Sequence, residues 1–374
     1  MFRIWSRLWL ALAFFLAIPA YGGAANAEPI DPEAVFRDVD NANARLRRQD
    51  VSLGDSLDRD IAILSEVLKD KSLAAESVIL VRYYRAVAWF FRNEFTAATH
   101  RGIYDTELTQ KALAEFEEVA AKIGELPAEN AQRVASIKAN ALYFAGSVAY
   151  EQMKDSSKAY RYWTACSALD HAGCLSSMAA ALSTGDGDLA VDLTEALRMH
   201  KRIFETATSY GCAGVYSAYS VALIVGLGAV TNTKDNAEIW IENASNLLNV
   251  IDADQPDEDR CSRENIRLAQ YLIALTHGKK KPVLLDGLIA SGASNPAVDV
   301  ARYLKGALDQ QSFEENLARH SDGTKCNAYF YALWDADIAR DKARARHFQS
   351  LMVGPQDMTC RIDVSYTKAL KTLQ

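Results

Sequence analysis

Hydrophobic residues recur along this chain at intervals of three and four positions, the spacing that puts side chains on one face of an α-helix. Residues 57–70, 111–126 and 265–278 each carry such a stripe, and the last one stops at Gly278, a typical helix end. The sequence therefore predicts helices of about 12 to 16 residues, joined by short polar turns. The stripes consist of Leu57, Ile61, Leu64, Leu68, Leu113, Phe116, Ala120, Ile123, Ile266, Ala269, Leu272 and Ile273.

The prolines support the same interpretation. Proline removes a backbone donor and clashes with the preceding helical turn, so a helical chain confines it to breaks. Period-two alternation with hairpin turn pairs is nearly absent. We predict an all-α fold of antiparallel helical hairpins. Beyond the N-terminal region, prolines stand only in polar or small-residue breaks, at Pro127, Pro256, Pro282, Pro296 and Pro355.

The first 27 residues have the three parts of a secretory signal peptide. Arg3 and Arg7 precede an apolar run, residues 8–20, and Ala25-Asn26-Ala27 ends the segment in a small-x-small pattern. The apolar run is shorter than the roughly 20 residues that span a bilayer as a helix. We predict cleavage after Ala27 and an exported, periplasmic protein that does not insert into the membrane. An uncleaved anchor is the alternative.

Charge narrows the choice of partners. Residues 1–27 carry two positive charges and no negative one, so their removal changes the formal net charge from −7 to −9. An acidic chain lacks the field that attracts phosphates, which argues against binding of nucleic acid or anionic lipid. A composition of 49% hydrophobic and 24% charged residues is typical of a globular protein.

Short motifs repeat at intervals near 40 residues in the middle of the chain. Ala159, Ala196 and Ala237 are each followed four residues later by a larger side chain, and they are 37 and 41 residues apart. The Gly-x-Gly at 185–187 also recurs 41 residues later. Small residues at such points let two helices approach closely, while the larger side chain fills the gap beside them. A fixed period of this length indicates stacked repeats.

This middle region resembles the helical cysteine-rich variant of the Sel-one-like repeat, in which Ala-Cys, seven residues and a second Cys close one hairpin onto the next. Here that motif is ACSALDHAGC, residues 165–174. The flanking segments ALYFAGSVAYEQMKDSSKAYRYWTAC (141–166) and AYFYALWDADIARDKARARHFQSLM (328–352) resemble tetratricopeptide repeats. The resemblance implies an α-solenoid of stacked antiparallel helical hairpins. An irregular helical bundle with accidental spacings is the alternative.

These observations divide the chain into four predicted parts. Residues 1–27 are the signal peptide, and 28–55 form an N-terminal extension. Residues 56–255 form the helical repeat array, with tetratricopeptide units followed by Sel-one-like units. Residues 256–374 form C-terminal helical hairpins, preceded by an acidic run that is a loop or a hinge.

Cys166 and Cys174 give the strongest local signal. Eight residues of continuous helix would separate their Cα atoms by about 12 Å, whereas a disulfide needs them within about 7 Å. The intervening segment supplies a turn, with Asp170 to end one helix and Gly173 to permit an unusual backbone angle. We predict a disulfide. A metal site would need further ligands, and His171 lies in the loop with no partner beside it; reduced thiols are the other alternative.

The remaining cysteines suggest further bridges. An even count in an exported chain favours disulfides, but four cysteines allow three connectivities. We prefer Cys326 with Cys360, because they flank one hairpin about one tetratricopeptide period apart. That choice leaves Cys212 with Cys261.

No arrangement of catalytic or cofactor-binding residues stands out. The six histidines lack the spacing of metal sites. The acidic segment 184–195, counted from its first acid Asp186, lacks the sixth-position glycine and twelfth-position glutamate of a helix-loop-helix calcium loop. The glycine-rich segment 225–235 does not follow a strand, as a phosphate-binding loop would. A Gly-x-Ser-x-Gly nucleophile motif is also absent, and so is the complete serine-lysine set of the penicillin-binding type, which combines Ser-x-x-Lys with Ser-Asp-Asn and Lys-Thr-Gly. We expect no enzyme activity, no metal and no cofactor.

Aromatic and arginine residues suggest a surface for a partner. Most aromatic side chains should pack between hairpins, but helical arrays present the first helix of each hairpin along a concave face. A groove of this kind would suit a peptide or an extended protein segment. The candidate groove residues are Tyr84, Arg85, Tyr150, Tyr219 and Tyr329.

The resemblance implies an exported scaffold or adaptor that binds envelope proteins or peptides through this groove. One alternative is a periplasmic regulator of a membrane sensor, or of polysaccharide or secretion machinery. Another is a cell-wall or β-lactam hydrolase, for which the sequence supplies no nucleophile and base.

Overall fold

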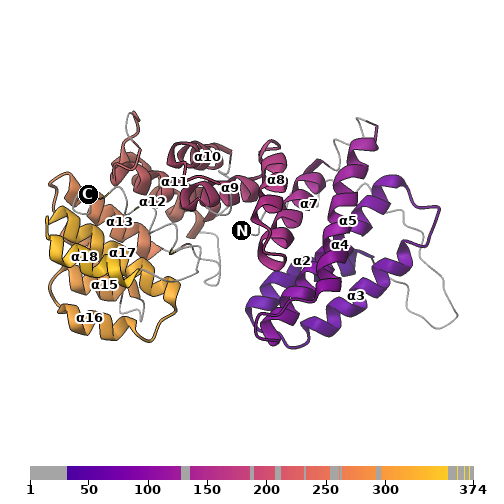
Figure 1. Cartoon of the computed structure of the whole chain (residues 1–374), viewed down its shortest axis with the longest axis horizontal. Coiled ribbons are helices and arrows are strands. Elements are labelled where there is room, and N and C mark those ends of the chain that lie inside the picture. The colour runs from indigo at the N-terminus through magenta and orange to yellow at the C-terminus, as the bar shows by residue number, and fades with distance from the viewer. Residues whose placement is uncertain are drawn as a thin grey trace. The chain divides into compact units, whose positions relative to one another are not determined.

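The computed structural model describes residues 32–127, 135–185, 189–206, 212–230, 233–252, 261, 263–291, 296–352, 360, 366 and 370. All regular structure in these ranges is helical (Figure 1), which confirms the predicted all-α class. The predicted signal peptide and its cleavage site lie outside the described residues. Within these ranges, no helix has the length and apolar character needed to cross a membrane.

The described helices fall into two compact units, with the boundary between Cys174 and Leu175. The N-terminal unit ends within α9 (Ala172–Thr184) and contains α2 (Pro32–Arg47), α3 (Leu53–Val67), α4 (Ala75–Thr99), α5 (Thr106–Glu125), α7 (Ala135–Ser147), the π-helix η2 (Val148–Gln152) and α8 (Ser156–Ser167). The C-terminal unit continues α9 and contains α10 (Leu193–Thr206), α11 (Cys212–Gly226), α12 (Ala237–Asp252), α13 (Arg263–Thr276), α14 (Pro282–Ala290), α15 (Pro296–Leu304), α16 (Gln310–Leu317), α17 (Asp322–Ile338) and α18 (Lys342–Leu351).

Helices of the N-terminal unit pack in the order of the chain. α2 packs on α3, α3 on α4, α4 on α5, α5 on α7 and α7 on α8, with further contacts of α2 with α4 and of α4 with α7 (Figure 1). The predicted N-terminal extension contains α2, and its Val39 and Ala42 are fully buried in this core. Packing between successive elements is what stacked helical hairpins require.

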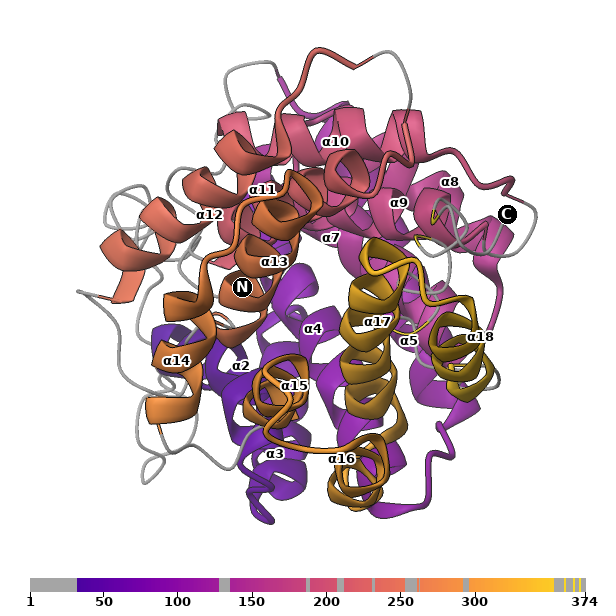
Figure 2. The same ribbon diagram turned by 90° about the vertical axis from the view of Figure 1, so that its left-hand side faces the viewer.

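The C-terminal unit has the same kind of succession. α10 packs on α11, and each later helix packs on the next as far as α16; α17 packs on α13, α15 and α18 (Figure 2 shows α17 beside α18). Trp334, on α17, is 1% exposed in the middle of this core. Cys360, Tyr366 and Leu370 are buried in the same core. Consecutive packing is therefore common to both units and is compatible with a helical repeat fold.

Local sequence explains where the helices begin and end. Asp105 accepts hydrogen bonds from the backbone N–H groups of Glu107 and Leu108 (2.8 and 3.0 Å), which satisfies free donors at the start of α5. Gly278 has a φ of 73° directly after α13, as its predicted role as a helix end requires. Prolines begin three of the described helices, α2, α14 and α15. Side-chain caps of the same kind as Asp105 occur at Asp155, Asp309, Ser321 and Asp341.

Gly146 shows how a small residue sets the distance between two helices. It lies on α7, opposite Trp163 of α8, and an added Cβ would stand 2.2 Å from the indole Nε1. No side chain could occupy that position without moving the ring. This pair reproduces the small-and-large alternation that the sequence displays in residues 141–166.

Candidate functional site

All six cysteines are joined in disulfides, in the pairs that the sequence analysis favoured. Cα–Cα distances are 5.8 Å for Cys166–Cys174, 5.4 Å for Cys212–Cys261 and 5.4 Å for Cys326–Cys360. Disulfides persist in oxidising compartments outside the cytosol. The three bridges therefore indicate an exported protein.

The turn between Cys166 and Cys174 differs in one respect from the prediction. Asp170 adopts the left-handed conformation, with a φ of 58°. Gly173, expected to provide that backbone angle, instead lies inside α9. A Cβ at Gly173 would stand 2.9 Å from the ring of Tyr143, so the glycine is required for close packing and not for its backbone freedom.

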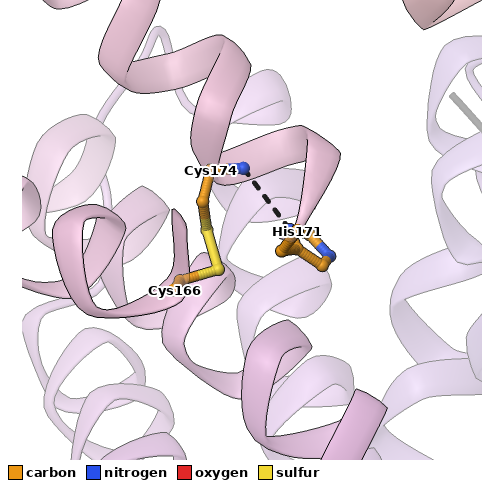
Figure 3. Close-up of side chains that lie close together, drawn as sticks. All are labelled: Cys166, His171 and Cys174. Carbon is orange, nitrogen blue, oxygen red and sulfur yellow. Dashed lines mark hydrogen bonds between the residues drawn. A yellow bond between two sulfur atoms is a disulfide. The ribbon is translucent and has the colours of Figure 1, made fainter. Parts of the chain in front are cut away.

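His171 lies beside this disulfide, where the sequence analysis expected no partner. Its Nδ1 accepts a hydrogen bond from the backbone N–H of Cys174 (3.3 Å; Figure 3), and its Nε2 lies 2.9 Å from Oδ1 of Asn140. Nδ1 therefore carries the lone pair and Nε2 the proton. Burial lowers the pKa of His171 to about 4, so the ring is neutral near pH 7. One atom each of Cys166, His171 and Cys174 lie within 4.8 Å of one another.

A second group of polar residues surrounds the π-helix, which inserts an extra residue into a helical turn, often at a functional position. The fully buried amide of Asn93 donates to Thr109 Oγ1 (2.8 Å) and to Gln152 Oε1 (2.9 Å). Gln152 in turn donates to Oε1 of Glu94 (2.8 Å), and Tyr104 donates to the other oxygen (3.4 Å). This network ties α4, the start of α5 and the π-helix together.

Two carboxylates adjoin this network, and two exposed apolar side chains are chain neighbours of its members. We call Glu94, Ile103, Tyr104, Glu151, Met153 and Lys154 the Glu94 surface. Ile103 is 69% exposed and Met153 is 40% exposed. Ile103 precedes Tyr104 in the chain and Met153 precedes Lys154, and Lys154 Nζ lies 5.9 Å from the centre of the Tyr104 ring. No spacing in the sequence indicates this cluster, because its members come from three separate segments.

Negative charge on this surface is incompletely neutralised. Burial raises the pKa of Glu94, although Gln152, Tyr104 and Lys154 oppose the shift. Burial and then the charge of Glu94 raise the pKa of Glu151 to about 7. Glu151 is nevertheless exposed to water, which screens its interaction with Glu94. A cation that approaches this surface would stabilise the ionised form of both carboxylates.

Two of the five predicted groove residues are buried in the core. Tyr84 is 3% exposed and stacks on Phe36 with ring centres 4.2 Å apart. Tyr329 is 8% exposed, with its ring 6.1 Å from that of Phe348. These tyrosines pack between helices, and their buried rings offer no surface to a partner in this structure.

The other three predicted groove residues are partly exposed and belong to two different units. Arg85 makes a two-pronged ion pair with Glu115 (2.6 and 2.9 Å). Tyr150 lies in the π-helix, which directly follows α7. Tyr219 belongs to the other unit, where its hydroxyl is hydrogen-bonded to that of Tyr331. The structure gives these side chains structural contacts, and a shared groove stays a prediction.

Two carboxylates, Asp38 partly exposed and Asp60 buried, lie where α2 packs on α3. Asp38 accepts hydrogen bonds from Ser56 and from Arg45 (2.7 Å). Although burial opposes it, these two contacts hold the pKa of Asp38 below its usual value. Asp60 is 2% exposed, its Oδ2 has no hydrogen-bond partner, and Arg59 lies 3.7 Å from its other oxygen. Burial and then the charge of Asp38 raise the pKa of Asp60 to about 7.

Asp60→Asn should stabilise the N-terminal unit at pH 8 by on the order of 2 kcal/mol. A carboxyl with a raised folded-state pKa favours the folded state below pH 4, and that contribution is lost as the pH rises towards 7. The amide keeps the neutral form and can donate to Asp38 at any pH. Amide hydrogen exchange of α2 and α3 at pH 5 and pH 8, corrected for intrinsic rates, measures the difference.

Asp58→Asn is the matched control, because its side chain is 55% exposed on the same helix and pairs with Arg92. We expect it to change stability by less than about 1 kcal/mol at both pH values. An Asp60→Asn variant with the same pH dependence as the original chain would contradict the raised pKa of Asp60.

Comparison with protein-family models, with curated proteins and with solved structures finds no match to this chain. The helical packing, the disulfides and the polar surfaces described above are therefore the basis for a functional proposal.

Proposed function

We propose that this chain is an exported helical-repeat scaffold, of tetratricopeptide and Sel-one-like type, that binds a segment of an envelope protein and carries out no catalysis. The consecutive packing of helices supports the repeat architecture. The three disulfides support export to an oxidising compartment. Repeat architectures commonly serve as rigid platforms for extended partners.

The observation that carries the binding proposal is the composition of the Glu94 surface. Ile103 and Met153 expose apolar area in the same short segments as Tyr104 and Glu151, and the carboxylates of Glu94 and Glu151 lack full neutralisation. A partner segment with a lysine or arginine next to an apolar residue would complement both features. The buried network beneath the surface holds it in place, which lowers the ordering cost of binding.

Crosslinking from this surface tests the proposal. A photoreactive amino acid replaces Met153 or Ile103 in the exported protein, and mass spectrometry identifies the captured envelope protein. The matched control places the same group at Val283, which is 71% exposed on α14 of the other unit. Binding is then measured with the two purified proteins.

We expect Met153→Asp with Ile103→Asp to weaken that binding at least tenfold, and Val283→Asp to leave it unchanged. Equal affinities of the two variants would contradict a role for the Glu94 surface. A captured membrane sensor would favour the regulator alternative over a general scaffold.

One observation favours a hydrolase as a second candidate. The raised pKa of Glu151, next to the carboxylate of Glu94, is a feature of acid-base pairs in glycoside-cleaving enzymes. Turnover of cell-wall glycans or β-lactams by the purified chain, abolished by Glu151→Gln, would support this candidate. Binding without turnover supports the scaffold.

A further inference from the structure

We propose that Cys166, His171 and Cys174 form a binding site for a soft d¹⁰ cation, Cu⁺ in particular, when the disulfide between the two cysteines is reduced. The three side chains already offer one ligand atom each within 4.8 Å of one another. Figure 3 shows the imidazole beside the two sulfur atoms. Reduction would replace a sulfur–sulfur bond by two thiols whose deprotonated forms are strong ligands of soft metals.

His171 is prepared to act as the third ligand. Its Nδ1 carries the lone pair, which would exchange the long 3.3 Å hydrogen bond from the Cys174 N–H for the metal, while Nε2 is fixed by Asn140. A ligating histidine in proteins characteristically donates its other ring N–H to such an oxygen, which fixes the ring orientation.

The ligand set favours Cu⁺ over Zn²⁺. Thiolates select soft cations, and Zn²⁺ in proteins takes four ligands. Among the described residues, no further His, Cys, Asp or Glu joins this group of three. Both cysteines are 0% exposed, so the surrounding packing hinders a water molecule from taking the fourth position. Cu⁺ is stable with three ligands.

The reduction step needs a dithiol, either a small molecule or a dithiol oxidoreductase. One dithiol gives two electrons and two protons to the Cys166–Cys174 bond; two thiols form, and the dithiol becomes a disulfide. Binding of Cu⁺ then releases the two thiol protons. The carbonyl oxygen of Ala139 lies 3.1 Å from Sγ of Cys166, where it can accept a hydrogen bond from the new thiol.

The test uses the full-length exported chain, reduced by a dithiol under native conditions and freed of reductant without oxygen. Cu⁺ is added in competition with a chromophoric chelator, and Zn²⁺ in a parallel arm. Alkylation and mass spectrometry identify which cysteines the metal protects, because the other two disulfides can also be reduced. We expect one Cu⁺ per chain, protection of Cys166 and Cys174, and weaker binding of Zn²⁺.

Variants that keep all six cysteines separate this site from the others. His171→Ala should weaken Cu⁺ binding at least tenfold, Asn140→Ala should weaken it about tenfold, and the exposed His277→Ala should leave it unchanged. The oxidised chain should bind no Cu⁺ at this site. The proposal is overturned if His171→Ala binds Cu⁺ as well as the original chain, if Zn²⁺ binds more tightly, or if Cys166–Cys174 resists reduction while circular dichroism shows the fold intact.

Discussion

Arg85→Ala should destabilise the N-terminal unit by about 3 kcal/mol, because it leaves the carboxylate of Glu115 buried without its main partner. The side chain of Glu115 is 5% exposed and that of Arg85 is 18% exposed. Arg85 Nη2 and Nε donate to the two carboxylate oxygens, and the guanidinium also lies 4.8 Å from the Trp89 ring. Arg82 remains 3.5 Å from Glu115, which keeps the loss at the lower end of the usual range.

Arg92→Ala is the matched control on the same helix. Arg92 pairs with Asp58, whose side chain is 55% exposed, so we expect a loss below about 1 kcal/mol. Replacement of both buried partners, by Arg85→Met with Glu115→Leu, should recover most of the stability, because no unpaired charge remains. Hydrogen exchange of α4 and α5 amides measures all three variants.

The pH dependence gives an independent check of the same variant. Burial raises the pKa of Glu115 even with Arg85 and Arg82 present, and loss of Arg85 should raise it further. A carboxyl with a raised folded-state pKa favours folding at low pH and loses that contribution as the pH rises. The Arg85→Ala penalty should therefore be smaller at pH 5 than at pH 8. An equal penalty at both values would show that lost packing on Trp89, and not the charge of Glu115, is responsible.

Arg85 also illustrates what the sequence could and could not predict. Periodicity predicted helices in 57–70, 111–126 and 265–278, and α3, α5 and α13 occupy these regions because apolar stripes need a partner face. The same pattern does not indicate whether an arginine faces solvent or a buried acid 30 residues away. Glu115, which pairs with Arg85, lies at helical spacing from the apolar residues Ala112 and Val119. A charged residue at such a position is the one signal in the sequence that could have indicated a buried pair.

Aromatic residues show the same limit. Tyr84 and Tyr329 were candidates for a groove, but both are buried. On a helix with neighbours on both sides, an aromatic side chain stabilises the fold more when it is buried between helices than when it is exposed to solvent. The Glu94 surface was missed because its members are joined through contacts between helices, such as Gln152 with Glu94, 58 residues apart. His171 was placed in the correct loop, and only the turn geometry brings its ring to the sulfur atoms.

Removal of the Cys212–Cys261 bridge should destabilise the C-terminal unit by about 4 kcal/mol, and removal of Cys166–Cys174 should destabilise the N-terminal unit by about 2.5 kcal/mol. The difference follows from loop length. The first bridge closes a loop with a sequence separation of 49 and the second one of 8, so the first removes more freedom from the unfolded chain. Both cysteines of a bridge are replaced by alanine together, so that no unpaired thiol remains. Three of the four cysteines are buried, so alanine, which is small and apolar, suits these positions.

Hydrogen exchange of α11 to α13, compared with α7 and α8, measures the two losses separately in the same chain. Cys→Ala changes at both bridges remove similar side-chain volume, so packing losses are comparable and the excess for Cys212–Cys261 reports loop closure. Equal losses would contradict the chain-entropy argument and point to native-state contacts of the sulfur atoms as the source of stability. A small cost at Cys166–Cys174 would in turn mean that this bridge can open while the N-terminal unit stays folded, which is the condition that metal binding at His171 requires.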